Sequence, residues 1–206
     1  INKAIEIIKK GLYKISDINS KIYSRNPYGP FTTSTLQQSA SSKLGYGASR
    51  TMQIAQRLYQ GIDIEGDAVG LITYIRTDGT NISNEAVADF RNYIQDSYGK
   101  NYLPVIPNNF SGKKAKNAQE AHEAIRPTDI NKSPDIMKKY LSSDQFKLYD
   151  LIWRRALSSQ MEAAKFDRKT ILIESKDNKH QFKTLGSIIK FDGFLKLSKI
   201  DENGEN

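Results

Sequence analysis

The sequence contains no cysteine, and this absence removes three classes of site at once. Without thiols the chain has no disulfide framework, no zinc ribbon and no cysteine nucleophile. It also lacks a run of about 20 apolar residues, so no segment predicts a transmembrane helix. The only histidines are His122 and His180, and a three-ligand zinc site would need carboxylates as well. We therefore expect no metal site within this chain.

Several common functional motifs are missing too. Gly45 and Gly47 are followed by Ala-Ser-Arg-Thr, which lacks the Gly-Lys-Ser/Thr ending of a phosphate-binding loop. No Gly-x-Ser-x-Gly sequence marks a serine hydrolase. Residues 62–70 contain two glycines and three acids, but they do not match the twelve-residue calcium loop. We expect residues 62–70 to form a solvated loop.

The chain does have an excess of positive charge. Its 206 residues include 31 Lys and Arg against 23 Asp and Glu, which gives a net charge of +8 and a pI near 9.4. Aromatic residues make up 10% of the sequence, so material for a folded core is present. This charge balance favours an anionic partner, nucleic acid above all, although basic proteins without such a partner exist.

Hydrophobic periodicity and capping residues predict helices in the middle of the chain and strands towards both ends. Helices are expected at 33–44, from Ser49 to Gly61, from Ser83 to Gly99, at 118–125, from Ser133 onward and at 144–161. Strands are expected at 12–24, 71–75, 169–174, 181–185 and 194–197. The order predicts an α+β fold. A mainly helical domain, 33–161, is inserted into a small β-rich domain made of 1–32 and 162–206.

Two segments of the helical region carry side chains suited to chemistry. Residues 70–83 (GLITYIRTDGTNIS), if extended, place Ile72, Tyr74 and Arg76 on one side, so that a phenol and a guanidinium share a face. A buried strand with an arginine that reaches solvent is the plainer alternative. Residues 118–128 (AQEAHEAIRPT) contain His122 and Arg126, which a surface helix would explain equally.

Together these segments resemble the bacterial type IA DNA topoisomerases. The matching motifs are 71–78 (LITYIRTD) and 119–128 (QEAHEAIRPT), supported by 30–38 (PFTTSTLQQ) with 55–59 (AQRLY). They occur in the family's order within residues 27–194. The resemblance implies a helical domain that carries the active-site tyrosine, set on two pieces of a β-rich arch.

The resemblance also implies a reaction and roles for Tyr74, Arg76 and His122. Tyr74 would attack a phosphodiester of single-stranded DNA and form a 5′-phosphotyrosyl intermediate, so that negatively supercoiled DNA relaxes without ATP. Arg76 would favour the phenolate and stabilise the phosphoryl charge. His122 would engage the DNA backbone. From the chemistry of the side chains, we also expect Asp78 to orient or charge His122. Arg126 would either contact phosphate or anchor the loop that follows it.

The family needs Mg²⁺, which the resemblance assigns to a domain that this sequence lacks, because no Asp-x-Asp-x-x-Gly motif is present. The implied partners are DNA with a single-stranded segment and the missing Mg²⁺-binding and helical domains of the same protein, without a membrane. The implied location is the bacterial cytoplasm, at the nucleoid.

The chain starts at Ile1 and ends in a polar tail, 201–206, so we expect a piece of a longer protein. Because the Mg²⁺-binding domain is missing, we expect this piece to be inactive alone. A non-catalytic module that binds single-stranded nucleic acid on the same fold is the alternative. The intact pair of Tyr74 and Arg76 argues against it, since a binding module does not need that pair.

Overall fold

The computed structural model describes residues 5–6, 9, 11–110, 123–177 and 179–197. The chain divides into two compact units, one built from Ile1–Arg25 with Ala164–Asp192, the other from Asn26–Ala163 with Gly193–Asn206. Helices and strands are both present, which confirms the α+β class. The domain bounds expected from the sequence stay a prediction.

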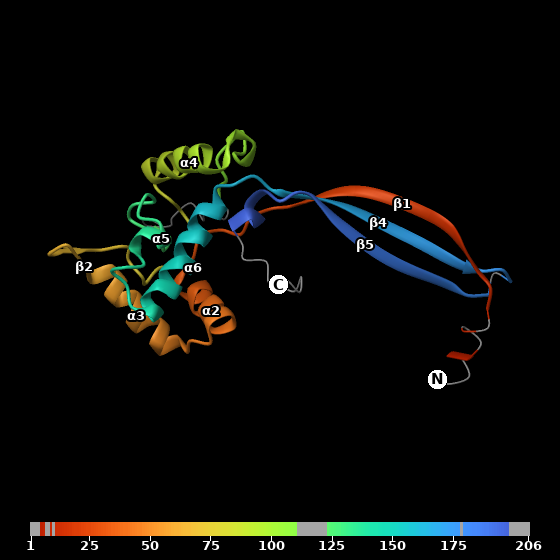
Figure 1. The fold of residues 1–206 in the computed structure, drawn as a ribbon, viewed down its shortest axis with the longest axis horizontal. Helices are drawn as coiled ribbons and strands as arrows, with labels where there is room; N and C mark the ends of the chain where they lie inside the picture. The colour runs from red at the N-terminus through yellow and green to blue at the C-terminus, as the bar shows by residue number, and fades with distance from the viewer. Residues whose placement is uncertain (1–4, 7–8, 10, 111–122, 178, 198–206) are drawn as a thin grey trace, which may run out of the picture. The chain divides into compact units, whose positions relative to one another are not determined.

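The first unit is a three-stranded antiparallel sheet (Figure 1). Strands β1 (Tyr13–Arg25) and β5 (Gln181–Phe191) both pair with β4 (Ala164–Ser175), so the order is β1-β4-β5. This pairing joins two stretches that are far apart in the sequence. The predicted strands at 12–24, 169–174 and 181–185 are confirmed, and the last two are longer than the alternation suggested.

The two faces of this sheet differ in polarity. The register pairs Ile18 with Ile171, and Ile173 with Phe182, so these residues lie on one face. That face is mainly apolar and holds Tyr13, Ile15, Ile18, Ile22, Ile171, Ile173, Phe182 and Ile188. The other carries most of the charge, with Lys14, Lys21, Arg25, Arg168, Glu174 and Lys183. Ile15, Ile18 and Ile22 are 57–67% exposed, so the apolar face of this unit is open to solvent.

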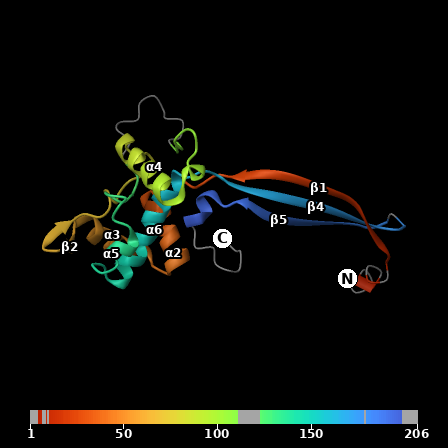
Figure 2. The ribbon, with the colours of Figure 1, turned by 45° about the horizontal axis from the view of Figure 1, so that its top comes forward.

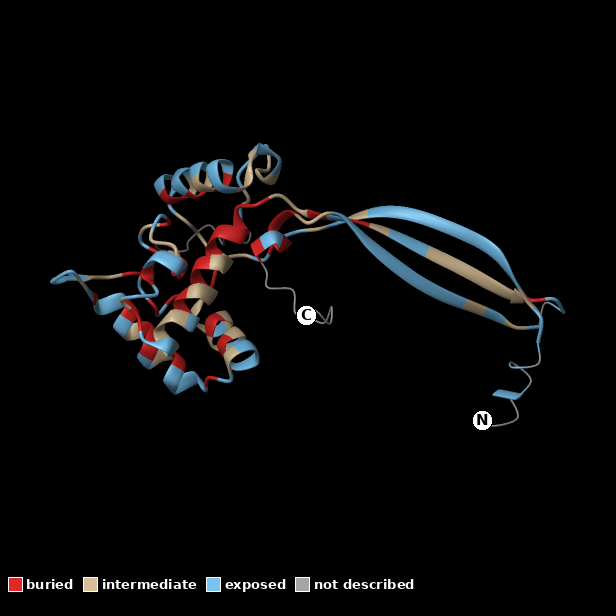
Figure 3. Cartoon of the chain, viewed as in Figure 1, coloured by how far each residue is buried: buried red, intermediate tan, exposed pale blue. Residues whose placement is uncertain are grey.

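The second unit is built around helix α6 (Ser143–Ser159), which packs against α2 (Thr33–Leu44), α3 (Ala48–Gln60) and α5 (Pro134–Met137). Figure 3 shows buried residues gathered along α6 and α3. The aromatic side chains of α6 satisfy their polar atoms inside this core. Trp153 Nε1 donates to the Ile130 carbonyl at 2.9 Å, and Tyr149 Oη donates to the Lys132 carbonyl at 2.6 Å.

Capping residues set the starts of two helices as the sequence predicts. Ser142 and Gln145 form the expected capping box of α6. Ser83 caps α4 (Asn84–Tyr98), where its hydroxyl accepts from the Ala86 amide. Helix α3 has Gly47 as its N-cap, so the prediction that Ser49 caps it is wrong and the helix begins two residues earlier than expected. The short helix η1 (Lys100–Tyr102) follows α4.

The prediction of a loop at residues 62–70 is wrong. These residues form a small hairpin of β2 (Ile62–Ile64) and β3 (Asp67–Val69) that projects from the helices (Figure 2). Its two turn residues, Glu65 and Gly66, both have positive φ, 59° and 100°. The Asp63 carboxylate accepts from the Gly66 amide at 2.9 Å. A two-residue turn of this kind favours a hairpin even in a polar segment.

Three further predictions are wrong because contacts distant in sequence decide the structure. Residues 71–75 form no regular strand, since only Ile72 makes a bridge, to Pro127. Residues 123–125, expected to end a helix, are extended and bridged to Asn81 and Phe31, while 118–122 lie outside the described residues. Residues 194–197 belong to the 3-10 helix η2 (Gly193–Leu197). In the described part of the chain, no helix has the length and apolar character needed to span a bilayer.

Candidate functional site

The segment that carries Tyr74 is fixed on its N-terminal side to the end of α3. The Leu71 amide donates to the Leu58 carbonyl at 2.8 Å, and the Leu71 carbonyl accepts from the Thr128 amide at 3.0 Å. A Cβ at Gly70 would lie 2.7 Å from the Tyr59 carbonyl oxygen. Glycine at position 70 therefore allows this segment to leave α3 at close range.

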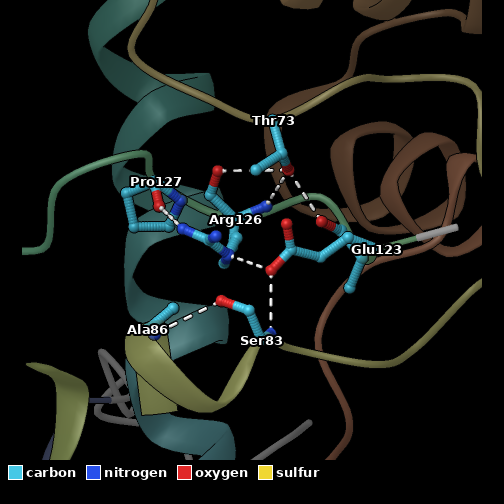
Figure 4. A network of polar contacts seen from close by, with 7 residues as sticks. Thr73, Ser83, Ala86, Glu123, Arg126 and Pro127 are labelled. Atoms are coloured by element: carbon cyan, nitrogen blue, oxygen red, sulfur yellow. Dashed lines mark hydrogen bonds and ion pairs between the residues drawn. The ribbon is translucent and has the colours of Figure 1, made fainter. Parts of the chain in front are cut away.

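Thr73 joins this segment to the other sequence motif, immediately before Tyr74 (Figure 4). The Thr73 amide donates to the Arg126 carbonyl at 2.9 Å, and the Arg126 amide donates to Thr73 Oγ1 at 3.0 Å. The same hydroxyl donates to the Ala124 carbonyl at 2.7 Å. The two motifs thus lie side by side, although about fifty residues separate them.

Thr33, the first residue of α2, holds the segment on the other side of Tyr74. Its hydroxyl donates to the Ile75 carbonyl at 2.7 Å and accepts from the Thr77 amide at 2.9 Å. The Thr33 amide donates to the Thr77 carbonyl, also at 2.9 Å. The sequence alone predicts no role for Thr33, although this residue lies in the third matching motif.

Exposure alternates from Tyr74 onward. Tyr74 is 48% exposed, Ile75 and Thr77 are buried, and Arg76 is exposed. Ile72 is only 1% exposed, so it does not present its side chain to solvent as Tyr74 and Arg76 do. Its bridge to Pro127 fixes it in the interior. The site therefore presents a phenol and a guanidinium to solvent from alternate positions of an anchored backbone.

Tyr59 contacts the ring of Tyr74. The two ring centroids lie 5.6 Å apart at an interplanar angle of 66°, an edge-to-face arrangement. Tyr59 lies in the last turn of α3 and is 38% exposed. The sequence alone predicts no role for Tyr59, and its only signal there is its place in the motif 55–59.

Arg126 takes part in a network with Glu123 that Figure 4 shows. Arg126 Nε donates to Glu123 Oε1 at 2.7 Å, and Nη1 donates to the Pro127 carbonyl at 2.9 Å. The same carboxylate oxygen accepts from the Ser83 amide at 2.9 Å. These contacts match the anchoring alternative for Arg126, whose side chain is only 12% exposed. A contact with DNA phosphate stays a prediction.

Glu123 is held in its charged form by this network. Its partial burial would raise the pKa of the carboxyl group. The hydrogen bonds from Arg126 and from the Ser83 amide outweigh burial, so the pKa lies below its ordinary value. The charge of Glu123 therefore helps to join residues 123–127 to the start of α4.

The remaining predicted site residues are less well placed. Asp78 is exposed, two positions after Arg76. His122 lies outside the described residues, so the expected pairing of Asp78 with His122 stays a prediction. Among the residues that the structure describes, no three His, Asp or Glu side chains are grouped as cation ligands. The described part of this chain therefore does not fit a magnesium site.

Comparison with known proteins agrees with the three motifs. A family model described as DNA topoisomerase matches residues 1–206. DNA topoisomerase 1 of Rickettsia prowazekii (strain Madrid E) is 47% identical over 200 residues, which cover 96% of this chain and 26% of that protein. DNA topoisomerase 1 of Campylobacter jejuni is 46% identical over 193 residues, covering 94% and 27%.

A solved structure extends the likeness to three dimensions. Full-length topoisomerase I from Thermotoga maritima superimposes with a TM-score of 0.85 at 37% identity, over 100% of this chain and 32% of that one. The chain thus spans about a quarter of the length of the curated relatives it matches. A family match over every residue, with these identities and this shared fold, shows that the chain belongs to the DNA topoisomerase family.

Proposed function

We propose that this chain supplies the nucleophile of a type IA DNA topoisomerase, which opens one DNA strand through Tyr74. The observation that carries the proposal is the exposed Tyr74 phenol on a backbone fixed on both sides, by Thr73 and by Thr33. A reacting group held in this way loses little conformational freedom when substrate binds.

The proposed reaction exchanges one phosphodiester for another. The Tyr74 oxygen forms a bond to phosphorus, the bond from phosphorus to the 3′ oxygen breaks, and the proton lost by the phenol is balanced by the proton gained at the 3′ oxygen. The products are a 5′-phosphotyrosyl link and a free 3′-hydroxyl. Since the new ester resembles the old one, religation needs no ATP, and negatively supercoiled DNA relaxes while the strand is open.

We assign to Arg76 the stabilisation of negative charge during this reaction. A free tyrosine has a pKa near 10, so only about one phenol in a thousand is ionised at neutral pH. A guanidinium beside the phosphate stabilises the phosphoryl oxygens as their charge changes, and its planar fork suits two oxygens at once. His122 is assigned to the DNA backbone.

The complete protein is proposed to act on a single-stranded segment of DNA at the bacterial nucleoid. We assign Mg²⁺ to a domain outside this chain, because the sequence has no Asp-x-Asp-x-x-Gly motif. We accordingly expect the 206-residue chain alone neither to relax plasmid DNA nor to cleave single strands appreciably.

The test is covalent capture by the complete protein of a single-stranded oligonucleotide labelled at either end. A 3′ label should stay with the denatured protein, while a 5′ label should leave on a shorter strand. Tyr74→Phe should abolish capture, and Tyr28→Phe, which keeps an exposed ring against Arg155, should not. Capture that survives Tyr74→Phe, or a 5′ label that stays with the protein, would overturn the proposal.

A further inference from the structure

A groove lies beside Arg76, between helices α2 and α3. It has a volume of about 840 Å³, and the residues that line it come from both helices and from the segment after Tyr74. Amide and guanidinium groups make up most of its polar lining. These residues are Gln37, Gln53, Gln56, Gln60, Arg57 and Arg76. We call this feature the amide groove.

Helical spacing explains how the amides come together. Gln53, Gln56 and Gln60 follow one another at intervals of three and four residues, so they lie on one face of α3. The opposite face of α3 is buried in the core through Ile54 and Leu58. The amide row is therefore held on a helix that the core fixes in place.

The chemistry of the groove fits a particular class of ligand. None of its lining residues is Asp or Glu, and two are arginines, which suits an anion. Each glutamine offers two donor hydrogens and an acceptor oxygen, a pattern that matches the edges of nucleic acid bases. A ligand that combines phosphates with such edges, and whose bases are free of a partner strand, is single-stranded nucleic acid.

We propose that the amide groove binds the bases of the DNA strand next to the phosphate at Tyr74, with Gln53 and Gln56 on base edges and Arg57 on a backbone phosphate. The inference rests on the proposed function, because Arg76 links the groove to the nucleophile. The groove then keeps the cleaved DNA strand aligned with Tyr74 until religation. It also makes the affinity for DNA sensitive to the bases at this position.

The test compares two short single strands of equal length and charge, one with all its bases and one with abasic positions throughout. Fluorescence anisotropy measures binding of each strand to the 206-residue chain at low ionic strength. The double variant Gln53→Leu, Gln56→Leu should bind the normal strand about tenfold more weakly and the abasic strand as the wild type does. Gln95→Leu is the matched control, since Gln95 is an exposed glutamine on α4 outside the groove.

A second variant separates backbone from base contacts. Arg57→Gln should weaken binding of both strands alike and lower the slope of log affinity against log salt by about one. The circular dichroism spectrum and melting curve of each variant check that it is folded. Gln56→Glu, which keeps the shape of the side chain, should also weaken binding, because its charge repels phosphate.

Three outcomes would overturn the inference. The first is that the glutamine double variant binds the normal strand as tightly as the wild type does. The second is that this variant loses the same affinity for both strands. The third is that the wild-type chain binds neither strand at low salt. The proposed function is judged separately, by covalent capture in the complete protein, whereas the groove is judged by how the glutamine variants bind the normal and the abasic strand. If covalent capture does not depend on Tyr74 but the glutamine variants still lose binding of the normal strand alone, the proposed function fails and the groove stands. If capture depends on Tyr74 but the glutamine variants bind both strands as the wild type does, the groove alone fails.

Discussion

The ring of Tyr59 meets the ring of Tyr74 edge to face, with centroids 5.6 Å apart. Tyr59 lies on α3, whose inner face is buried, whereas Tyr74 is half exposed on an irregular segment. The edge-to-face contact thus joins the exposed ring to a helix that packs in the core. We infer that Tyr59 is a positioning residue for the proposed nucleophile.

The first prediction concerns this ring contact in the complete protein. Tyr59→Ala should slow covalent capture of a single-stranded oligonucleotide by about two- to tenfold, the equivalent of ~0.5–1.5 kcal/mol for an aromatic pair. Tyr59→Phe keeps the ring and should restore the rate. Affinity for uncleaved DNA, measured in the Tyr74→Phe background, should change less than the capture rate. A Phe variant as slow as the Ala variant would show that the hydroxyl, not the ring, matters.

The second prediction concerns Arg76. Arg76→Ala leaves the nucleophile but removes a positive charge from the site, so the capture rate should fall about a hundredfold, or ~3 kcal/mol. Arg76→Lys should restore only part of the rate, because an ammonium group cannot replace a two-pronged guanidinium. The measurement is single-turnover capture at saturating oligonucleotide. If Arg76→Ala cleaved at the wild-type rate, the role assigned to Arg76 would be wrong.

Local signals predicted much of the helical unit. Ser83, Ser142 and Gln145 act through backbone groups within three residues, so the sequence reveals the starts of α4 and α6. The segment at Tyr74 depends instead on Thr33, more than forty residues away, and on the chain around Arg126. Hydrophobic periodicity carries no information about those contacts. It predicts a strand at 71–75, but among the described residues this run makes only the bridge from Ile72 to Pro127.

In the candidate site, too, the sequence predicts some residues and only the tertiary contacts reveal others. Motif resemblance singled out Tyr74 and Arg76, and the structure finds both exposed on one anchored segment. The roles of Thr33 and Tyr59 could not be predicted, because each acts through a contact that only the packing of α2 or α3 creates. A motif shows which residues matter, but their partners follow from the tertiary structure.

The third prediction tests the clamp made by Thr33. Thr33→Val keeps the shape of the side chain but removes the hydroxyl, which leaves the Ile75 carbonyl and the Thr77 amide without this partner. The free energy of unfolding of the helical unit should fall by about 1–3 kcal/mol. Urea unfolding followed by fluorescence measures this, since Trp153 is the only tryptophan and lies in that unit. Thr33→Ser keeps the hydroxyl and should stay near the wild type, so equal losses in both variants would count against the clamp.

The last prediction concerns pH and Glu123. Because the folded protein holds the pKa of this carboxyl group below its ordinary value of 4.5, folding favours the charged form. The stabilisation is complete at pH values above the unfolded pKa and is lost as pH falls through the lower, folded pKa. Glu123→Gln should therefore unfold at lower urea than the wild type at neutral pH, and the difference should shrink as the solution is made more acidic.

Trp153 fluorescence in urea, recorded from neutral pH down into the acid range, measures this difference. Asp89→Asn removes an exposed carboxylate from α4 and serves as the control, with a small effect on the unfolding midpoint at neutral pH. Arg126→Gln removes the other half of the ion pair and should lose the same acid-dependent stabilisation as Glu123→Gln. A gap between wild type and Glu123→Gln that stayed constant down to acid pH would mean that the shape of the side chain, and not its charge, joins residues 123–127 to the start of α4.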